Sequence, residues 1–124
     1  MALGTTTSIT DAQIHIWGAD TADRPWPKDH GAPSLPTPFA AGDAIAAMDQ
    51  AGVARSVLIP PSWEGDRNDL VLQAAKEHPG RFGVMGRIDL EAPSDSHLQA
   101  WKQTPGMLGI RISHRLLFSE GFAD

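Results

Sequence analysis

The sequence predicts an α/β fold in which about four parallel strands alternate with three helices. Two observations lead to this prediction. Short apolar segments of strand length begin near residues 56, 82 and 107, and a segment with helical periodicity separates each from the next. Their spacing of about 25 residues is typical of consecutive βαβ units, whose crossovers are almost always right-handed and whose strands are therefore parallel.

The first strand is predicted over residues 8–17, where Ile14 and Ile16 alternate with the polar Gln13 and His15. Side chains of a strand point alternately to its two faces, so the isoleucines share one face and the polar residues share the other. We therefore expect Ile14 and Ile16 to pack against helices, with Gln13 and His15 on the opposite side of the sheet.

Residues 18–38 are predicted to form a long loop, because they contain five of the ten prolines. A helix is expected from about residue 40 to Ala51, with Gly52 as its left-handed C-terminal cap. Residues 56–59 follow as a strand, since a short, almost wholly apolar run is typical of a strand buried on both faces of a parallel sheet.

The same alternation of helix and strand is expected twice more, with polar residues as N-terminal caps and a Pro-Gly pair after each helix. The expected elements are a helix from Asp66 or Asn68 to about residue 77, a strand over 82–88, a helix from Ser94 or Asp95 to about residue 104, and a strand over 107–112.

Length and charge restrict the class of function. At 124 residues the chain is too short for two ordinary domains. Its ten basic residues are scattered and outnumbered by fifteen acidic ones, so we expect neither nucleic acid nor a membrane as partner. The absence of cysteine excludes thiolate metal sites and cysteine nucleophiles. The first ten residues lack the features of a secretory signal, and we expect a cytoplasmic protein that acts on a small molecule.

Gln13 and His15 form the most informative pair of polar residues. One strand repeat separates them, so both side chains can approach the same ion or substrate. His15 is therefore a candidate catalytic residue and metal ligand, and Gln13 a candidate substrate contact and a weaker metal ligand. The alternative is that His15 is a hydrogen-bonded strand histidine without a catalytic role.

This strand and several later segments resemble the amidohydrolase-related branch of the amidohydrolase superfamily, which includes lactonase-like and pyrone-dicarboxylate-hydrolase-like enzymes. The resemblance extends over about residues 8–113, with the segments in the family's order and at its spacing. They are DAQIHIW at 11–17, MDQAGV at 48–53, VLI at 57–59, PSWEGDRN at 61–68, HPGRF at 78–82 and GIR at 109–111.

This resemblance implies that the chain is the N-terminal half of a (β/α)8 TIM barrel, with the active site at the C-terminal ends of the strands. In metal-using relatives, two histidines of the first strand help to bind an ion, zinc or manganese, that activates water. Here Gln13 stands where the first of these histidines is expected. Its amide oxygen is a weaker zinc ligand than imidazole, which favours the relatives that hydrolyse lactones without a metal, with a carboxylate as base.

Arg111 is a candidate substrate-binding residue, because a guanidinium group at a barrel mouth is a natural bidentate partner for a substrate carboxylate. The family resemblance also implies a substrate-contacting arginine in this region. The alternative is a structural ion pair with Asp89 or another carboxylate at a strand end. Arg87 and Asp89 share parity on the strand over 82–88 and are a further candidate pair.

Other candidate substrate contacts follow strand ends. Ser62 and Asn68 lie in the loop after the second strand, where this architecture builds its site, although Asn68 also suits a helix cap. Trp17, together with Trp26 and Trp63, can wall a pocket for a cyclic substrate, and packing within the loops is the alternative.

Together these features favour a hydrolase that acts on a small, carboxylated lactone, ester or amide through an activated water. The alternative is an inactive barrel half that only binds a ligand or a partner chain. We expect that the 124 residues are a truncated barrel and form an inactive unit by themselves, because four parallel strands leave two unpaired edges. Such a unit has reason to associate with another copy of itself.

Overall fold

The computed structural model describes residues 7–28, 33, 35, 37–89 and 94–112. Within them, four parallel strands form one sheet in the order β1-β2-β3-β4. The strands are β1 (Thr10–Ile14), β2 (Arg55–Leu58), β3 (Phe82–Gly86) and β4 (Met107–Ile110). The helices are α1 (Ala41–Ala51), α2 (Asp69–Glu77) and α3 (Asp95–Gln103), with a 3-10 turn, η1 (Ser62–Glu64), after β2.

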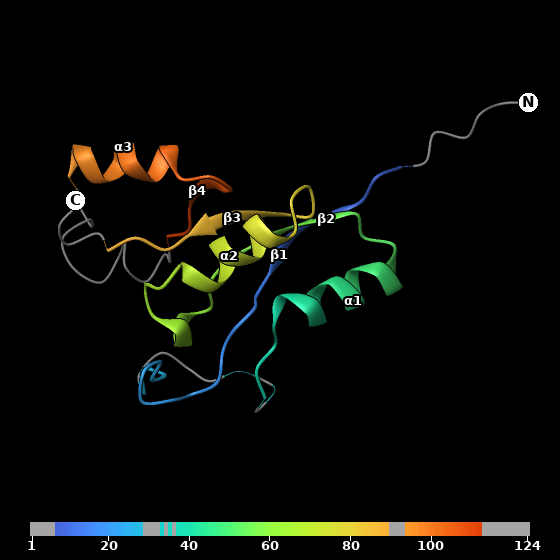
Figure 1. The fold of residues 1–124 in the computed structure, drawn as a ribbon, viewed down its shortest axis with the longest axis horizontal. Helices are drawn as coiled ribbons and strands as arrows, with labels where there is room; N and C mark the ends of the chain where they lie inside the picture. The colour runs from blue at the N-terminus through green and yellow to red at the C-terminus, as the bar shows by residue number, and fades with distance from the viewer. Residues whose placement is uncertain (1–6, 29–32, 34, 36, 90–93, 113–124) are drawn as a thin grey trace, which may run out of the picture.

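Each strand lies beside the next one in the chain, and a helix forms each connection (Figure 1). Such an order is the one found in the wall of a (β/α)8 barrel, where every strand pairs with its successor and the helices form an outer layer. The α/β prediction with four parallel strands and three helices is therefore confirmed. None of the helices in the described ranges is long and apolar enough to cross a lipid bilayer.

The hydrophobic core lies between the sheet and the helices α1 and α2. Ile16 belongs to it and Ile14 packs against it, which confirms the face predicted for both isoleucines. The sheet contributes Leu58, Phe82 and Val84, all of them buried. The helices contribute Ala44, Met48, Val71, Ala74 and Ala75.

The predicted helix ends are confirmed where a local motif determines them. Gly52 adopts the left-handed conformation (φ 71°) after α1, and the Val53 N–H donates to the Met48 carbonyl at 2.8 Å. At the start of α3 the Ser94 hydroxyl accepts the His97 N–H at 3.2 Å.

The first strand is shorter than predicted: it ends at Ile14 and not at residue 17. The pairing of β1 with β2 is irregular between Asp11 and Ile14, where the Asp11 carboxylate accepts the Gln13 N–H at 2.9 Å. After Ile14 the chain leaves the sheet, and Trp17 pairs with Phe39 as an isolated bridge. The strands predicted to end at 88 and 112 end at Gly86 and Ile110.

In the described part of the chain, the face of the sheet opposite α1 and α2 carries half-buried and exposed residues, among them Val57 and Leu108, and is called the open face below. Leu108 lies on this face over Gly83, where an added Cβ would be 2.4 Å from the leucine Cδ1. Leu108 is nevertheless 65% exposed. In a closed barrel this face is interior and filled by side chains.

We propose that the 124-residue chain associates with itself through this open face and the edges of β1 and β4. Light scattering after size-exclusion chromatography is expected to show a mass that rises with concentration. Leu108→Asp should shift the protein towards monomer, whereas Leu35→Asp, at an equally apolar exposed position in a loop, should not. A strictly monomeric wild-type chain at all concentrations would contradict the proposal.

Candidate active site

Gln13 and Arg111 meet across the open face of the sheet. The Arg111 guanidinium donates to the Gln13 amide oxygen at 3.1 Å, although the residues are 98 positions apart. Ile14 pairs with Leu58, which faces the core, so the preceding Gln13 faces the open side. Arg111 directly follows β4. The fold therefore brings these two candidate residues together at the C-terminal ends of the two outer strands.

His15 is held at the end of β2. Its Nδ1 lies 2.7 Å from the main-chain carbonyl oxygen of Ile59. A carbonyl oxygen only accepts hydrogen bonds, so Nδ1 is the donor in this contact, and in the neutral form of the ring the lone pair is on Nε2. The strand-end position and the assigned tautomer leave His15 with one nitrogen suited to accept a proton or to bind an ion.

A cluster of aromatic rings lies on one side of His15. Trp63, from η1, lies edge-on to the His15 ring with centroids 6.1 Å apart, and also edge-on to Trp17 at 5.6 Å. Trp17 is 8% exposed, stacks on Phe39 and donates its indole N–H to the Thr37 carbonyl at 3.0 Å. These contacts are the ones expected if Trp17 packs within the loops. Any contact of Trp17 with a substrate stays a prediction.

An ion-pair network next to these rings joins the two loops after β1 and β2. Arg24 pairs with Glu64 of η1 and, at 2.5 Å, with Asp69 at the start of α2. Burial acts to lower the pKa of Arg24, but its hydrogen bonds to the two carboxylates outweigh this effect and raise that pKa. Burial acts to raise the pKa of Asp69, but its hydrogen bonds with Arg24 and the Leu70 N–H outweigh this effect, so the pKa of Asp69 is lowered.

This network was not predicted from the sequence. Arg24 and Glu64 are 40 positions apart, and each lies in a segment without helical or strand periodicity. No local pattern marks two such residues as partners. The one available signal was the pair of opposite charges in loops that both follow strand ends.

Asn68 has a structural role at the end of β3. Its amide accepts the Arg87 N–H and donates to the Arg87 carbonyl oxygen, both at 2.8 Å. It occupies the cap position of α2 without a side-chain cap bond. Arg87 pairs with Asp66 at 3.7 Å, so the ion pair that forms differs from the predicted pair with Asp89. Ser62 is half-buried at the start of η1.

The described residues do not by themselves form a metal site. No group of three or more His, Asp or Glu side chains that could hold an ion is present among them. His15 offers one nitrogen, and the Gln13 oxygen is already bonded to Arg111. Zinc sites use four ligands, or three with water, so this donor set does not fit zinc without ligands from elsewhere.

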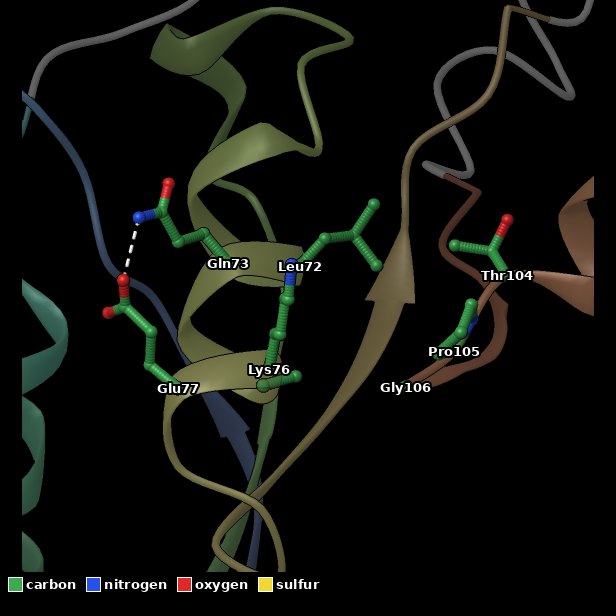
Figure 2. Close-up of a pocket in the computed structure, with 8 residues that line it drawn as sticks. Leu72, Gln73, Lys76, Glu77, Thr104, Pro105 and Gly106 are labelled. Atoms are coloured by element: carbon green, nitrogen blue, oxygen red, sulfur yellow. Dashed lines mark hydrogen bonds between the residues drawn. The ribbon is translucent and has the colours of Figure 1, made fainter.

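A groove of about 850 Å³ lies on the outer side of the molecule, away from these residues. It separates α2 from the turn before β4, with Leu72 and Lys76 on one wall and Thr104 to Gly106 on the other (Figure 2). Gln73 donates to Glu77 along its edge at 2.6 Å. Gln13, His15 and Arg111 do not line this groove, so it is separate from the candidate active site.

Comparison with solved structures identifies the fold. No protein-family model matches the sequence, and no curated protein matches it. A probable 2-pyrone-4,6-dicarboxylic acid hydrolase from Acinetobacter baumannii, solved with citric acid bound, superimposes with a TM-score of 0.69 at 18% identity. A putative hydrolase of the same kind from Pseudomonas putida gives 0.65 at 21% identity, and a protein from Agrobacterium tumefaciens gives 0.57 at 18%.

These matches cover 86%, 85% and 84% of this chain, but 38%, 36% and 36% of the three proteins. The chain therefore spans little more than a third of their length. The chain thus has the fold of part of a (β/α)8 barrel, and two of its structural neighbours are described as 2-pyrone-4,6-dicarboxylic acid hydrolases.

Proposed function

We propose that the chain is part of a barrel hydrolase that opens a small, carboxylated lactone, ester or amide with an activated water. Two kinds of support converge on this function. The fold is shared with proteins described as hydrolases of a cyclic dicarboxylate, one of them solved with a tricarboxylate bound. The candidate residues at the C-terminal ends of the strands have chemistry that suits such a substrate.

The observation that carries the proposal is the environment of Arg111. Its guanidinium group is exposed and bonded to a neutral amide, and none of the carboxylates in the described ranges forms an ion pair with it. Its positive charge is therefore not neutralised by a neighbour in this part of the chain. A substrate carboxylate can take two of the guanidinium N–H donors and restore charge balance at the site.

His15 supplies the acid–base group in this proposal, in place of the carboxylate base that the resemblance implies for relatives without a metal. The Nε2 lone pair accepts a proton from water while the water oxygen attacks the carbonyl carbon of the substrate. The carbon–oxygen bond of the lactone then breaks, and the leaving oxygen takes the proton back from His15 Nε2, which gives the hydroxy acid and regenerates the neutral ring. The Ile59 carbonyl keeps Nδ1 protonated and so directs Nε2 to this role.

Binding of 2-pyrone-4,6-dicarboxylate tests the substrate class. Arg111→Met is expected to weaken calorimetric binding of the dicarboxylate by about tenfold or more, because a charge-assisted, bidentate contact is lost. Arg55→Met is the control. It removes an exposed arginine at the N-terminal end of β2, away from the C-terminal strand ends that form the candidate site, and should leave binding unchanged. Equal affinities for the wild type and Arg111→Met would contradict the proposed contact.

Turnover separates the hydrolase from a protein that only binds. The assay follows the loss of pyrone absorbance in the 124-residue chain and in the product of a reading frame extended beyond residue 124. Hydrolysis by the longer product, lost in His15→Gln, is the expected result. Tight binding without hydrolysis in either protein would favour the alternative of an inactive, ligand-binding barrel half.

A further inference from the structure

We propose that Glu64 is a positioning residue, whose buried carboxylate holds the loops after β1 and β2 in the arrangement that orients His15. The inference rests on the proposed role of His15 as acid–base group. Its test reads the state of the imidazole ring and not turnover, so the two proposals can fail separately.

Glu64 is charged and almost completely buried. Its side chain is 3% exposed. One carboxylate oxygen accepts the Gly18 N–H at 2.7 Å, and the other accepts the Arg24 guanidinium. A buried carboxylate is strongly destabilising unless both its charge and its hydrogen-bonding capacity are satisfied. Both partners come from the loop after β1, so the ionised Glu64 requires that loop to be packed against η1.

Arg24 extends this attachment to α2. Its second guanidinium nitrogen lies 2.5 Å from the Asp69 carboxylate in the first turn of the helix. Gly18 leaves the space that Arg24 occupies, because a Cβ at position 18 would lie 2.9 Å from the Arg24 Cδ. The loop after β1 is thus joined to both η1 and α2, with Glu64 as the buried partner and Asp69 as the exposed one.

The link from Glu64 to His15 is Trp63. It precedes Glu64 in η1, and its ring lies edge-on to both His15 and Trp17. His15 is therefore held by the Ile59 carbonyl at Nδ1 and by the Trp63 ring beside it. Movement of η1 would withdraw Trp63 and allow the imidazole to rotate away from Ile59.

Labelling of histidines with diethyl pyrocarbonate tests this role in the 124-residue chain, because the reagent attacks an accessible, unprotonated imidazole nitrogen. Peptide masses report His15, His78 and His97 separately in one sample. In Glu64→Gln, which keeps the shape but loses the charge, we expect His15 to react about tenfold faster, since a charge-assisted bond is weakened. His78 and His97 should be unchanged.

Asp69→Asn is the matched control. It removes the other carboxylate partner of Arg24, whose side chain is 53% exposed, and leaves the pair with Glu64 in place. We expect the reactivity of His15 in this variant to stay close to that of the wild type. An equal increase in Asp69→Asn and Glu64→Gln would show that general loosening of α2 explains the effect, and would overturn the proposal.

A second pair of variants keeps the proposal testable if Glu64→Gln fails to fold, in which case the reagent would label His15, His78 and His97 alike. Arg24→Met should increase the reactivity of His15 selectively, and Arg24→Lys should restore most of the wild-type value. Long-range ¹⁵N spectra should show the Nδ1-protonated ring in the wild type and in Arg24→Lys, and a mixture of tautomers in Arg24→Met. An unchanged His15 in a folded Glu64→Gln or Arg24→Met protein would overturn the inference.

The outcomes for the two proposals are distinguishable. A selective response of His15 to Glu64→Gln, without hydrolysis of any lactone by the wild type or its extended form, would retain the positioning role and remove the proposed reaction. Hydrolysis by the extended form, without a response of His15 to Glu64→Gln, would retain the proposed reaction and remove the positioning role.

Discussion

Leu58→Ala is expected to lower the free energy of unfolding by about 2 to 5 kcal/mol, the usual range for truncation of a buried leucine. Leu58 has no exposed surface and lies in β2, between β1 and β3, against the helices. Truncation leaves a cavity in the core. Because β2 is hydrogen-bonded to a strand on each side, the surrounding residues cannot easily move to fill that cavity. Denaturation by urea, followed by circular dichroism, measures the change.

Val57→Ala is the matched control for Leu58→Ala. Val57 is adjacent in β2 but half-buried on the open face, where solvent can replace the lost methyl groups. Its substitution is expected to cost about 1 kcal/mol or less. Equal losses in the two variants would mean that the open face is covered in solution, and the assignment of core and open faces would have to be revised. Because small domains are stable by only about 5 to 15 kcal/mol, Leu58→Ala is expected to bring this chain close to unfolding.

Gln13→His is expected to increase metal binding in a protein that comprises all the strands of the barrel. Loss of one of four ligands costs several kcal/mol of the roughly 10 to 16 kcal/mol typical of a structural zinc site, so the natural Gln13 form should hold zinc weakly or not at all. The substitution supplies a second imidazole one strand repeat from His15 and also removes the amide partner of Arg111. Elemental analysis of both proteins after identical purification measures zinc and manganese per chain.

Activity need not rise with metal content in Gln13→His, because a base suited to a site without metal would then face a cation. Gln13→Asn is the control, since it retains an amide but shortens it and adds no imidazole. Metal content should be the same in this variant as in the wild type. Stoichiometric zinc or manganese in the natural Gln13 form would contradict the expectation, and the metal-independent mechanism would have to be abandoned.

Features that depend on neighbours in sequence could be predicted. The alternation around Ile14 and Ile16 indicated which side of β1 faces the core, because side-chain direction in a strand follows from residue parity. Gly52 and Ser94 marked helix ends, because their capping bonds join residues within one turn. The end of β1 could not be predicted in this way, since the irregularity after Asp11 depends on its pairing with β2.

The candidate site was predicted as separate residues and not as an arrangement. His15 and Arg111 stood out through residue type and position after strands, but nothing in the local pattern indicated that Arg111 would bond to Gln13. The same holds for Asn68, which holds the end of β3 through Arg87, 19 positions away. These residues become partners only because the sheet brings the ends of their strands close together.

The amino-acid sequence by itself determined the order of strands and helices, the parallel sheet and the side of β1 that packs against helices, because these follow from local periodicity and the handedness of βαβ crossovers. The tertiary structure alone decided how the charged and polar residues are paired. Arg24 joins Glu64 and Asp69 because the loops after β1 and β2 converge at the same end of the sheet. A hydrogen bond or ion pair acts over a few ångströms regardless of separation along the chain, so only the folded chain selects its partners.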